Sequence, residues 1–364
     1  MPFIVLLILS LLLSTPAGAA PHRAKKKNPA RRHAVHKAAA SASLNPEAVN
    51  DSGLAAPVGP GSSGPATLRA QILLARAHFS CGEIDGHYGS NLQGAISDFQ
   101  TAHGLPSSGT LDAAGWKILN ADAAPALVRV AVAPEDVAGP FTPIPEDMME
   151  KAKLPALGYS SPLEEIAEKY HVSPALLKKL NPRARFDTAG EELLAPNVLV
   201  EPPGKAASVV VSKSRHSLAA LDAGGRILAR YPVTSGSEHD PLPIGKWKIT
   251  GVAKNPPFHY NPALFWDAKE TQEKAHIAPG PNNPVGVAWI DLSKEHYGIH
   301  GTPEPSTIGK TQSHGCIRLT NWSVAALAQA IVPGTPAVLR DSADSSGAVT
   351  AASSARNAKE TRSR

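Results

Sequence analysis

The chain has 364 residues, enough for two or three domains, and 42% of them are apolar, enough for packed cores. Its formal net charge of +5 has a local source, because seven lysines and arginines and no acidic residue lie between residues 22 and 37. Outside that run the chain has 29 basic and 31 acidic side chains, so no general basic surface is expected. This distribution argues against nucleic acid as a partner.

The first twenty residues predict a signal peptide, at 1–20. Residues 3–13 are a nearly unbroken apolar run, and Pro16 and the small residues Ala17-Gly18-Ala19-Ala20 follow it. A run of this length that ends in small residues is typical of a secretory signal and is too short to span a bilayer. No lysine or arginine precedes the run, so an uncleaved membrane anchor stays open as the alternative.

Composition separates stretches that can fold from stretches that cannot. Three stretches lack apolar periodicity and are expected to be a disordered basic, Ala/Pro-rich tether at 21–63, a linker at 121–156 and a disordered tail at 342–364. The stretches that can fold are 64–120, 157–202 and 205–341.

Residues 64–120 are predicted to form three short helices. Leu68 and Leu73 belong to the first helix, Ser90 is a good N-cap for the second, and Gly104 is placed to end it. Apolar residues of the second and third helices are Leu92, Ala95, Ile96 and Phe99, followed by Leu111, Ile118 and Leu119.

Three segments of this stretch resemble the small helical peptidoglycan-binding domain. They are Ile84-Asp85-Gly86-His87-Tyr88-Gly89, Ala95-Ile96-Ser97-Asp98-Phe99-Gln100 and His103-Gly104-Leu105. The resemblance implies that residues 64–120 bind peptidoglycan through its glycan. A plain helical spacer with the same packing is the alternative.

In the second stretch, one apolar helix face is formed by Leu163, Ile166, Ala167 and Tyr170. The run Leu193-Leu194-Ala195-Pro196 closes the stretch. Residues 157–202 therefore resemble a LysM module, an α+β unit of two helices and two strands that holds N-acetylated glycan. The Gly-Asp-Thr/Ser usual before the first helix is replaced by Ser160-Ser161-Pro162, and the first strand is not evident, so a structural spacer is an equal alternative.

Residues 205–341 change to a strand pattern. The β-branched or apolar runs are Ser208–Val211, Leu218–Leu221, Arg226–Val233, Gly245–Val252, Val287–Leu292 and Pro336–Leu339. Asn321 is predicted to cap one helix that runs from Trp322 to Ala330. The pattern indicates a β-rich domain with a single clear helix.

The residues that can carry a reaction lie in two segments, Tyr297–Thr302 and Ser313–Leu319. A cysteine is a nucleophile only as its thiolate, and a histidine within hydrogen-bond reach can take the thiol proton and later return it to a leaving amine. His314 would share a strand face with Cys316, two residues later. His300 ends a different strand and can face the thiol across a gap.

Glycines flank both histidines in these segments. Gly301 and Gly315 have no side chains, which leaves room where a substrate backbone must approach. The N–H groups of Gly315 and Cys316 are free to converge on an oxyanion.

Other interpretations of these residues have to be weighed. His296, His300, His314 and Cys316 could be four zinc ligands, because even spacing keeps side chains on one strand face. Cys316 could instead be a buried core thiol, which its small polar neighbours argue against. Ser313 as the nucleophile is disfavoured, because adjacent residues point to opposite faces of a strand. A disulfide with Cys81 is not expected, because the two cysteines lie in different predicted domains.

Five segments resemble, in family order, the catalytic domain of L,D-transpeptidases. They are Pro243-Ile244-Gly245, Asn255-Pro256-Pro257, Gly280–Gly286, Ile299–Thr302 and Ser313–Leu319. The resemblance is to the ErfK/YbiS/YcfS/YnhG-like cell-wall branch, which also has an arginine where this chain has Arg318. It implies a multidomain protein in which a β-rich sandwich catalytic domain at 205–341 follows a small three-helix domain and the LysM-like module.

Carried over residue by residue, the resemblance implies a cysteine acyltransferase. Cys316 attacks the third residue, diaminopimelate, of a tetrapeptide stem and releases D-alanine. His300 is the base, oriented by the carbonyl of Gly301, and His314 helps to shape the site and its charge. An amine from another stem or from a lipoprotein then resolves the thioester.

The remaining site residues are expected to contact the substrate. They are Ser313, Gly315 and Arg318, of which Arg318 would hold a carboxylate or, equally, form a structural salt bridge. Neither a cofactor nor a metal is implied, and the expected location is the periplasm, in association with the cell wall. The rival functions are a wall-binding scaffold with an inactive catalytic domain and a zinc-dependent wall hydrolase.

Overall fold

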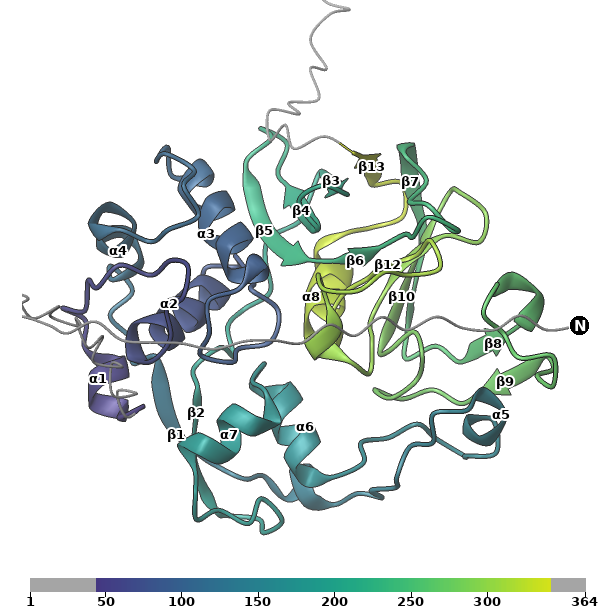
Figure 1. Cartoon of the computed structure of the whole chain (residues 1–364), viewed down its shortest axis with the longest axis horizontal. Helices are drawn as coiled ribbons and strands as arrows, with labels where there is room; N and C mark the ends of the chain where they lie inside the picture. The colour runs from purple at the N-terminus through teal and green to yellow at the C-terminus, as the bar shows by residue number, and fades with distance from the viewer. Residues whose placement is uncertain (1–43, 342–364) are drawn as a thin grey trace, which may run out of the picture. The chain divides into compact units, whose positions relative to one another are not determined.

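The computed structural model describes residues 44–341 (Figure 1). The predicted signal peptide, most of the predicted tether and the predicted tail lie outside the described residues. Among the residues that are described, no helix is both long enough and apolar enough to cross a membrane.

Three helices form where the apolar spacing predicts them. They are α2 (Pro65–Arg76), α3 (Ser90–Ala102) and α4 (Ala113–Leu119). The predicted cap of α3 is wrong by one residue, because Gly89 is the N-cap and no side chain caps this end. At the other end of α3, Gly104 follows the C-cap His103 with φ of 68°, a conformation that glycine adopts without strain.

The C-terminal part of the predicted tether is folded. Helix α1 (Pro46–Asn50) buries Val49, and Val58 is also fully buried in the same core. The side chain of Asn50 donates to the carbonyl of Leu127 at 2.9 Å and accepts from its N–H at 2.8 Å. Isolated valines without periodicity do not mark an element in sequence, yet long-range contacts hold this segment in place.

The predicted linker at 121–156 is likewise not a plain linker. It contains β1 (Leu127–Ala131), the 3-10 helix η1 (Pro134–Val137) and α5 (Met148–Lys151). Strand β1 pairs antiparallel with β2 (Glu192–Pro196), which follows α6 (Pro162–Lys169) and α7 (Pro174–Leu180). The strand that the LysM-like interpretation lacks thus lies upstream of the expected module. The interpretation itself stays a prediction.

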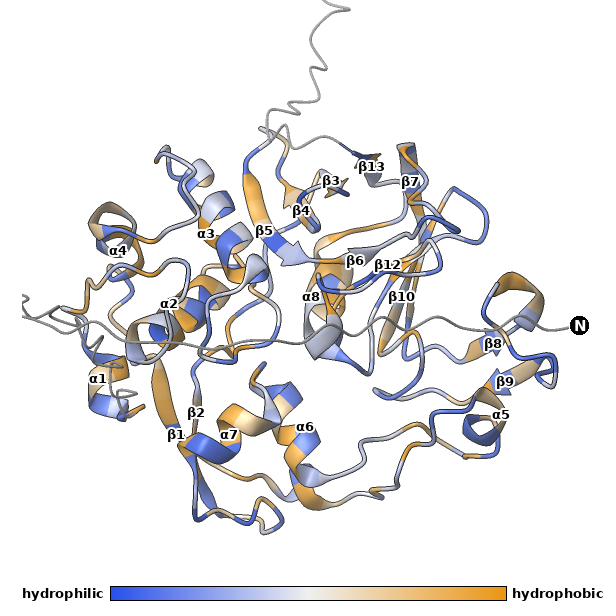
Figure 2. Cartoon of the chain, viewed as in Figure 1, coloured by the Kyte–Doolittle hydropathy of each residue, from blue (hydrophilic) through white to orange (hydrophobic). Residues whose placement is uncertain are grey.

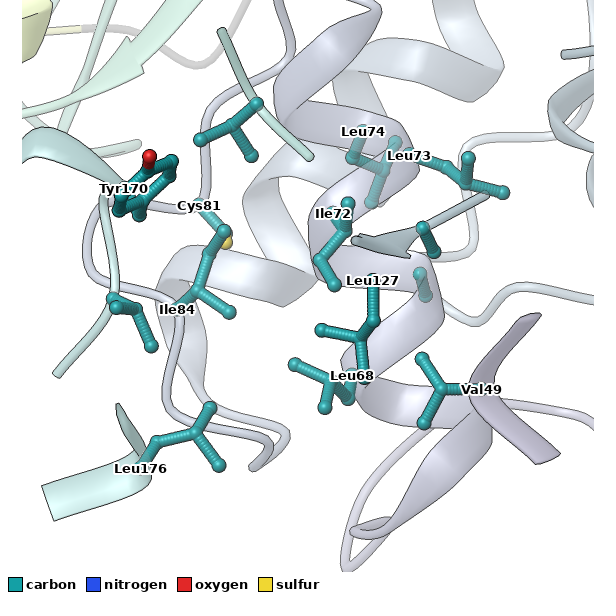
Figure 3. Packing of buried hydrophobic residues seen from close by; sticks show 14 of the residues in the cluster. Val49, Leu68, Ile72, Leu73, Leu74, Cys81, Ile84, Leu127, Tyr170 and Leu176 are labelled. Atoms are coloured by element: carbon teal, nitrogen blue, oxygen red, sulfur yellow. The ribbon is translucent and has the colours of Figure 1, made fainter. Parts of the chain in front are cut away.

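The helical domain and this second module share one hydrophobic core. Ile84 joins them, because its N–H donates to the carbonyl of His171 and its carbonyl accepts from Ser173, each at 2.9 Å. Figure 3 shows part of the cluster, with Ile84, Cys81 and Tyr170 labelled. Cys81 and Cys316 are both free thiols, and burial raises the pKa of Cys81 to about 12.

A continuous nine-stranded sheet is the main element of the domain predicted at 205–341. In sheet order the strands are β5 (Ile227–Pro232), β4 (Ser217–Leu221), β3 (Ser208–Ser212), β13 (Pro336–Arg340), β7 (Gly245–Lys254), β10 (Ala288–Leu292), β11 (Gly298–His300), β12 (Ile317–Arg318) and β6 (Thr234–Ser235). The ten residues of β7 pair first with β13 and then with β10, so this strand joins the two halves of the sheet.

Helix α8 (Asn321–Ala330) packs on this sheet, and both are largely hydrophobic where they meet (Figure 2). The predicted cap of α8 is wrong, because Thr320 is the N-cap and accepts from the N–H of Ser323 at 3.3 Å. Asn321 instead makes contacts outside the helix. A separate hairpin of β8 (Phe258–Tyr260) and β9 (Ala275–Ile277), with the 3-10 turn η2 (Pro262–Leu264) between them, lies beside the sheet.

A buried ion pair attaches the helical domain to the catalytic sheet. Arg230 on β5 is 1% exposed, and its guanidinium lies 3.2 Å from the carboxylate of Asp98 on α3. The same guanidinium donates to the carbonyl of Ser80 at 2.8 Å, and Arg215 also pairs with Asp98. A Cβ on Gly94 would lie 2.4 Å from the guanidinium of Arg230, so a larger residue there would displace this buried group.

We expect Asp98→Ala to destabilise the chain by about 3–5 kcal/mol, because it leaves the buried charge of Arg230 without its partner. Chemical denaturation measures this change. Glu150→Ala is the control, because its pair with Lys153 is exposed and should contribute little. An Asp98→Ala midpoint equal to that of the wild type would contradict the assignment.

Candidate active site

The register of two short strands brings the two reactive segments together. Strands β11 and β12 pair in parallel, with Ile299 opposite Ile317 and His300 opposite Arg318. Cys316 immediately precedes β12, so it lies beside the start of β11, next to Gly298. It is half-buried, and its Sγ faces the carbonyl oxygen of His296 at 3.8 Å.

Burial keeps the thiol of Cys316 protonated at rest. Desolvation raises its pKa above the ordinary value, and the nearby carboxylate of Asp240 acts in the same direction. The backbone N–H of Gly298 and the guanidinium of Arg318 oppose this shift without cancelling it. If this thiol is the nucleophile, it needs a base to take its proton.

His300 has the geometry of such a base. Its ring is 5% exposed and stacks on Trp289, with centroids 5.4 Å apart and planes at 17°. Nδ1 lies 2.7 Å from the carbonyl oxygen of Gly301, the contact that the family resemblance implies. Because a carbonyl can only accept, the proton sits on Nδ1 and the lone pair on Nε2. Burial, with a smaller effect of Arg318, lowers the pKa of His300 to about 3, so the ring is neutral.

The segment before Cys316 is a turn, not the strand that the spacing argument assumes. Gly315 has φ of 96°, and a Cβ there would lie 2.7 Å from the ring of Tyr297. The idea that His314 and Cys316 share a strand face is therefore wrong. Among the described residues, the N–H groups of Gly315 and Cys316 have no acceptor, which leaves both available to an oxyanion.

Ser313 holds this turn and is not open to a substrate. Its side chain is buried; the hydroxyl donates to the carbonyl of Cys316 at 2.6 Å and accepts from the N–H of Gly236 at 2.7 Å. The prediction that Ser313 binds substrate is at odds with these bonds, because the hydroxyl proton is already donated. Its hydrogen bonds instead position the backbone of the nucleophile.

His314 contacts the segment that follows β8. Its Nε2 lies 2.8 Å from Oδ1 of Asp267, and its ring meets the edge of Phe265 at 5.0 Å. Its Nδ1 is buried and has no partner within the described part of the chain. These contacts fit a residue that shapes the site.

Arg318 is available for a substrate carboxylate. Within residues 44–341, no acidic side chain lies within salt-bridge distance of its guanidinium, although Glu304 and Asp267 act on it from farther away. The structural salt bridge, the other interpretation of this residue, is therefore not formed. Partial burial lowers its pKa, and a half-buried cation near the thiol favours an anionic ligand.

The residues weighed as zinc ligands do not form a metal site. Across the described ranges, no group of three or more His, Cys, Asp or Glu side chains is placed to hold a metal ion. His300 and His314 are each engaged by a different partner, Gly301 and Asp267.

Sequence reasoning missed two residues of the site. Trp289 pairs with His300 across β10 and β11, a neighbour that only the strand register reveals. Asp267 lies far from His314 in sequence, and the adjacent aromatic pair Phe265-Trp266 was the signal that could have pointed to this segment.

Comparison with known proteins now identifies the family. Residues 206–339 match the model of the L,D-transpeptidase catalytic domain, and residues 63–119 match that of a peptidoglycan binding domain. A Bacillus subtilis (strain 168) protein named as the L,D-transpeptidase YkuD is 32% identical over 174 residues, which are 48% of this chain and 90% of the relative. The chain belongs to the L,D-transpeptidase family.

Other relatives agree with this assignment. An Escherichia coli (strain K12) protein named as the L,D-transpeptidase YbiS is 26% identical over 184 residues, which are 49% of this chain and 60% of that protein. The solved L,D-transpeptidase from Xylanimonas cellulosilytica is 17% identical with a TM-score of 0.33, over 77% of this chain and 95% of that one. L,D-transpeptidase 3 from Mycobacterium tuberculosis is 15% identical with a TM-score of 0.30, over 43% and 72%. Because these TM-scores are low, the assignment rests on the sequence matches.

This enzyme is thus a multidomain L,D-transpeptidase in which a peptidoglycan binding domain precedes a β-rich catalytic domain. The two family matches support peptidoglycan as its substrate. The LysM-like module has no such support and stays a prediction.

We expect iodoacetamide to alkylate Cys316 faster with each step from about pH 7 to about pH 9, because a thiol with a raised pKa keeps gaining thiolate over this range. Arg318→Gln should slow the reaction several-fold at about pH 8, because loss of the cation raises the thiol pKa further. Peptide mass spectrometry separates Cys316 from Cys81, and Lys310→Gln, which removes a cation from the preceding loop, is the control. A rate that levels off below about pH 8 would show that the thiol is not desolvated as described.

Proposed function

We propose that this L,D-transpeptidase acts through a thioester on Cys316. The observation that supports it is the arrangement of His300, whose Nδ1 is held by Gly301 and whose Nε2 is left as a base beside the turn that carries the thiol. The N–H groups of Gly315 and Cys316 stand unpaired at the same place. A nucleophile, a base and an oxyanion site are the three groups that acyl transfer requires.

The first half of the reaction acylates the enzyme. The carbonyl of the third stem residue, diaminopimelate, lies against the two N–H groups, and Nε2 of His300 takes the Sγ proton as Sγ attacks the carbonyl carbon. The C–N bond to D-alanine then breaks, and the imidazolium gives its proton to the leaving amine. Burial disfavours the imidazolium, so this charge exists only between the two proton transfers.

The second half transfers the acyl group to an amine. The amine attacks the thioester carbonyl, Nε2 of His300 takes a proton from the amine, and the imidazolium returns this proton to Sγ as the C–S bond breaks. The acceptor in our proposal is the amine of another stem, which forms a cross-link, or that of a lipoprotein. The carboxylate of the stem is held by Arg318, which has no acidic partner within salt-bridge distance among the described residues.

Incubation with a disaccharide-tetrapeptide should release D-alanine and produce cross-linked dimers, both read by mass spectrometry. Cys316→Ala should abolish the release of D-alanine, because the thiol that attacks the stem carbonyl is gone. His300→Ala should slow it by about 10²–10⁴-fold, the usual contribution of a positioned base.

The buried Cys81 supplies the matched control for this experiment. Cys81→Ser should retain the wild-type rate if the chain remains folded. D-alanine release by Cys316→Ala, or its loss in folded Cys81→Ser, would mean that the wrong thiol is assigned. Tripeptide without cross-linked product would instead identify water as the acceptor.

We also propose that the enzyme is exported and works in the periplasm at the cell wall. The apolar run at 3–13, followed by small residues, supports export. The match of residues 63–119 to a peptidoglycan binding domain supports retention on the wall.

The full-length Cys316→Ala protein should sediment with purified sacculi as completely as the wild type, because binding and acyl transfer use different residues. Sedimentation with and without sacculi, followed by protein quantification, measures this. A Cys316→Ala protein that stays in the supernatant would show that retention depends on the covalent intermediate instead.

A further inference from the structure

The second module inserts one carboxylate into the catalytic domain. Glu168, near the end of α6, accepts hydrogen bonds from Nδ2 of Asn321 at 3.1 and 3.2 Å and from the hydroxyl of Tyr159 at 3.0 Å. Desolvation raises its pKa to about 7, as expected for a carboxylate taken largely out of water. Such burial is costly, so the contact with Asn321 calls for an explanation beyond surface packing.

Asn321 links Glu168 to the loop that precedes β10. The residue is 1% exposed and lies at the start of α8, five positions after Cys316. Its Nδ2 also donates to the carbonyl of Pro281 at 3.0 Å, and its Oδ1 accepts from the N–H of Val287 at 3.2 Å. Both ends of the amide are engaged, so the side chain has a single position.

The amide of Asn321 packs directly on the residue that orients the base. A Cβ on Gly301 would lie 2.2 Å from Oδ1 of Asn321, and one on Gly286 would lie 2.0 Å from the same atom. Gly301 is therefore enclosed on this side by Asn321, Gly286 and Val324, and its carbonyl is the acceptor for Nδ1 of His300. A shift of Asn321 would open space behind the Gly301 peptide and allow this carbonyl to turn.

We propose that Glu168 is a positioning residue for His300 and acts through Asn321 and Gly301. The chain of contacts runs from the second module through a fixed amide to the carbonyl that selects the Nδ1–H tautomer. Outer hydrogen-bond partners of this kind orient the group that does the chemistry without touching the substrate. The proposal rests on the proposed role of His300 as the base.

A neighbouring contact provides a matched comparison. Glu164, one turn earlier on α6, accepts from Nδ2 of Asn282 at 2.8 Å, so it also bonds an asparagine of the catalytic domain. Asn282 donates as well to the carbonyl of Gly158 but does not reach Gly301. Glu164 therefore tests the general effect of loosening this interface.

The experiment follows acylation of the full-length protein by a carbapenem, an acyl donor whose ring carbonyl stands for the stem amide. Intact-mass spectrometry at several concentrations gives the first-order acylation constant and the half-saturating concentration. Glu168→Ala should lower the first-order constant by about 10-fold, the smaller end of the effects seen for outer hydrogen-bond partners, and leave the half-saturating concentration unchanged. Glu164→Ala should leave both constants at the wild-type values.

Two conservative variants separate positioning from a structural role. Glu168→Gln should recover most of the rate, because its amide oxygen still accepts from Asn321 and Tyr159. Glu168→Asp should be as slow as Glu168→Ala, because the shorter side chain keeps the charge but no longer reaches Asn321. If the alanine variant fails to fold, Glu168→Asp replaces it in the rate comparison. In ¹⁵N-histidine NMR spectra, the slow variants should lose the Nδ1–H signature of His300.

The outcomes that would overturn the proposal are distinct from failure of the proposed function. Wild-type acylation constants in folded Glu168→Ala or Glu168→Asp would overturn it, as would equal losses in Glu164→Ala and Glu168→Ala. Absence of any adduct on the wild-type protein would instead contradict the thioester mechanism.

Discussion

The parallel pairing of β11 with β12 is the constraint on which the site depends. It involves only two residue pairs, yet it places His300 opposite Arg318 and brings Cys316 to the start of the neighbouring strand. Such a short pairing is stable only where its surroundings hold both strands. Here β10 flanks β11 on one side and β6 flanks β12 on the other, and Ile299 and Ile317 are fully buried between them.

Burial also determines the charge state of the reacting groups. The same desolvation that raises the pKa of the Cys316 thiol lowers that of the His300 imidazole, so the resting site holds a neutral pair. Arg318 adds to the effect on His300 and opposes that on Cys316. The Arg318 cation thus favours the thiolate form of Cys316 and disfavours a second positive charge on the His300 ring.

The domains that precede the catalytic domain are packed against the loops of the site. Asn91 of α3 donates to the carbonyl of Ile308 at 2.8 Å, in the loop that connects His300 with Cys316. On the other module, Leu157 donates to the carbonyl of Pro279, and its own carbonyl accepts from Asn282. These modules therefore contribute to the shape of the catalytic domain in addition to any binding of the wall.

The amino-acid sequence by itself determined the catalytic segments and most of the regular elements, and tertiary contacts decided the rest. The motifs that contain His300, Gly315 and Cys316 can be recognised from short stretches of sequence. The helix α3 and the strand β10 can be predicted locally as well, because the spacing of their apolar residues shows which face each element buries. The folding of α1 and β1 depends on valines and an asparagine whose partners are distant in sequence. No local sequence pattern therefore predicts these two elements. For the same reason the turn at Ser313, the Asp267 contact of His314 and the contact of Glu168 with Asn321 could be found only in the fold.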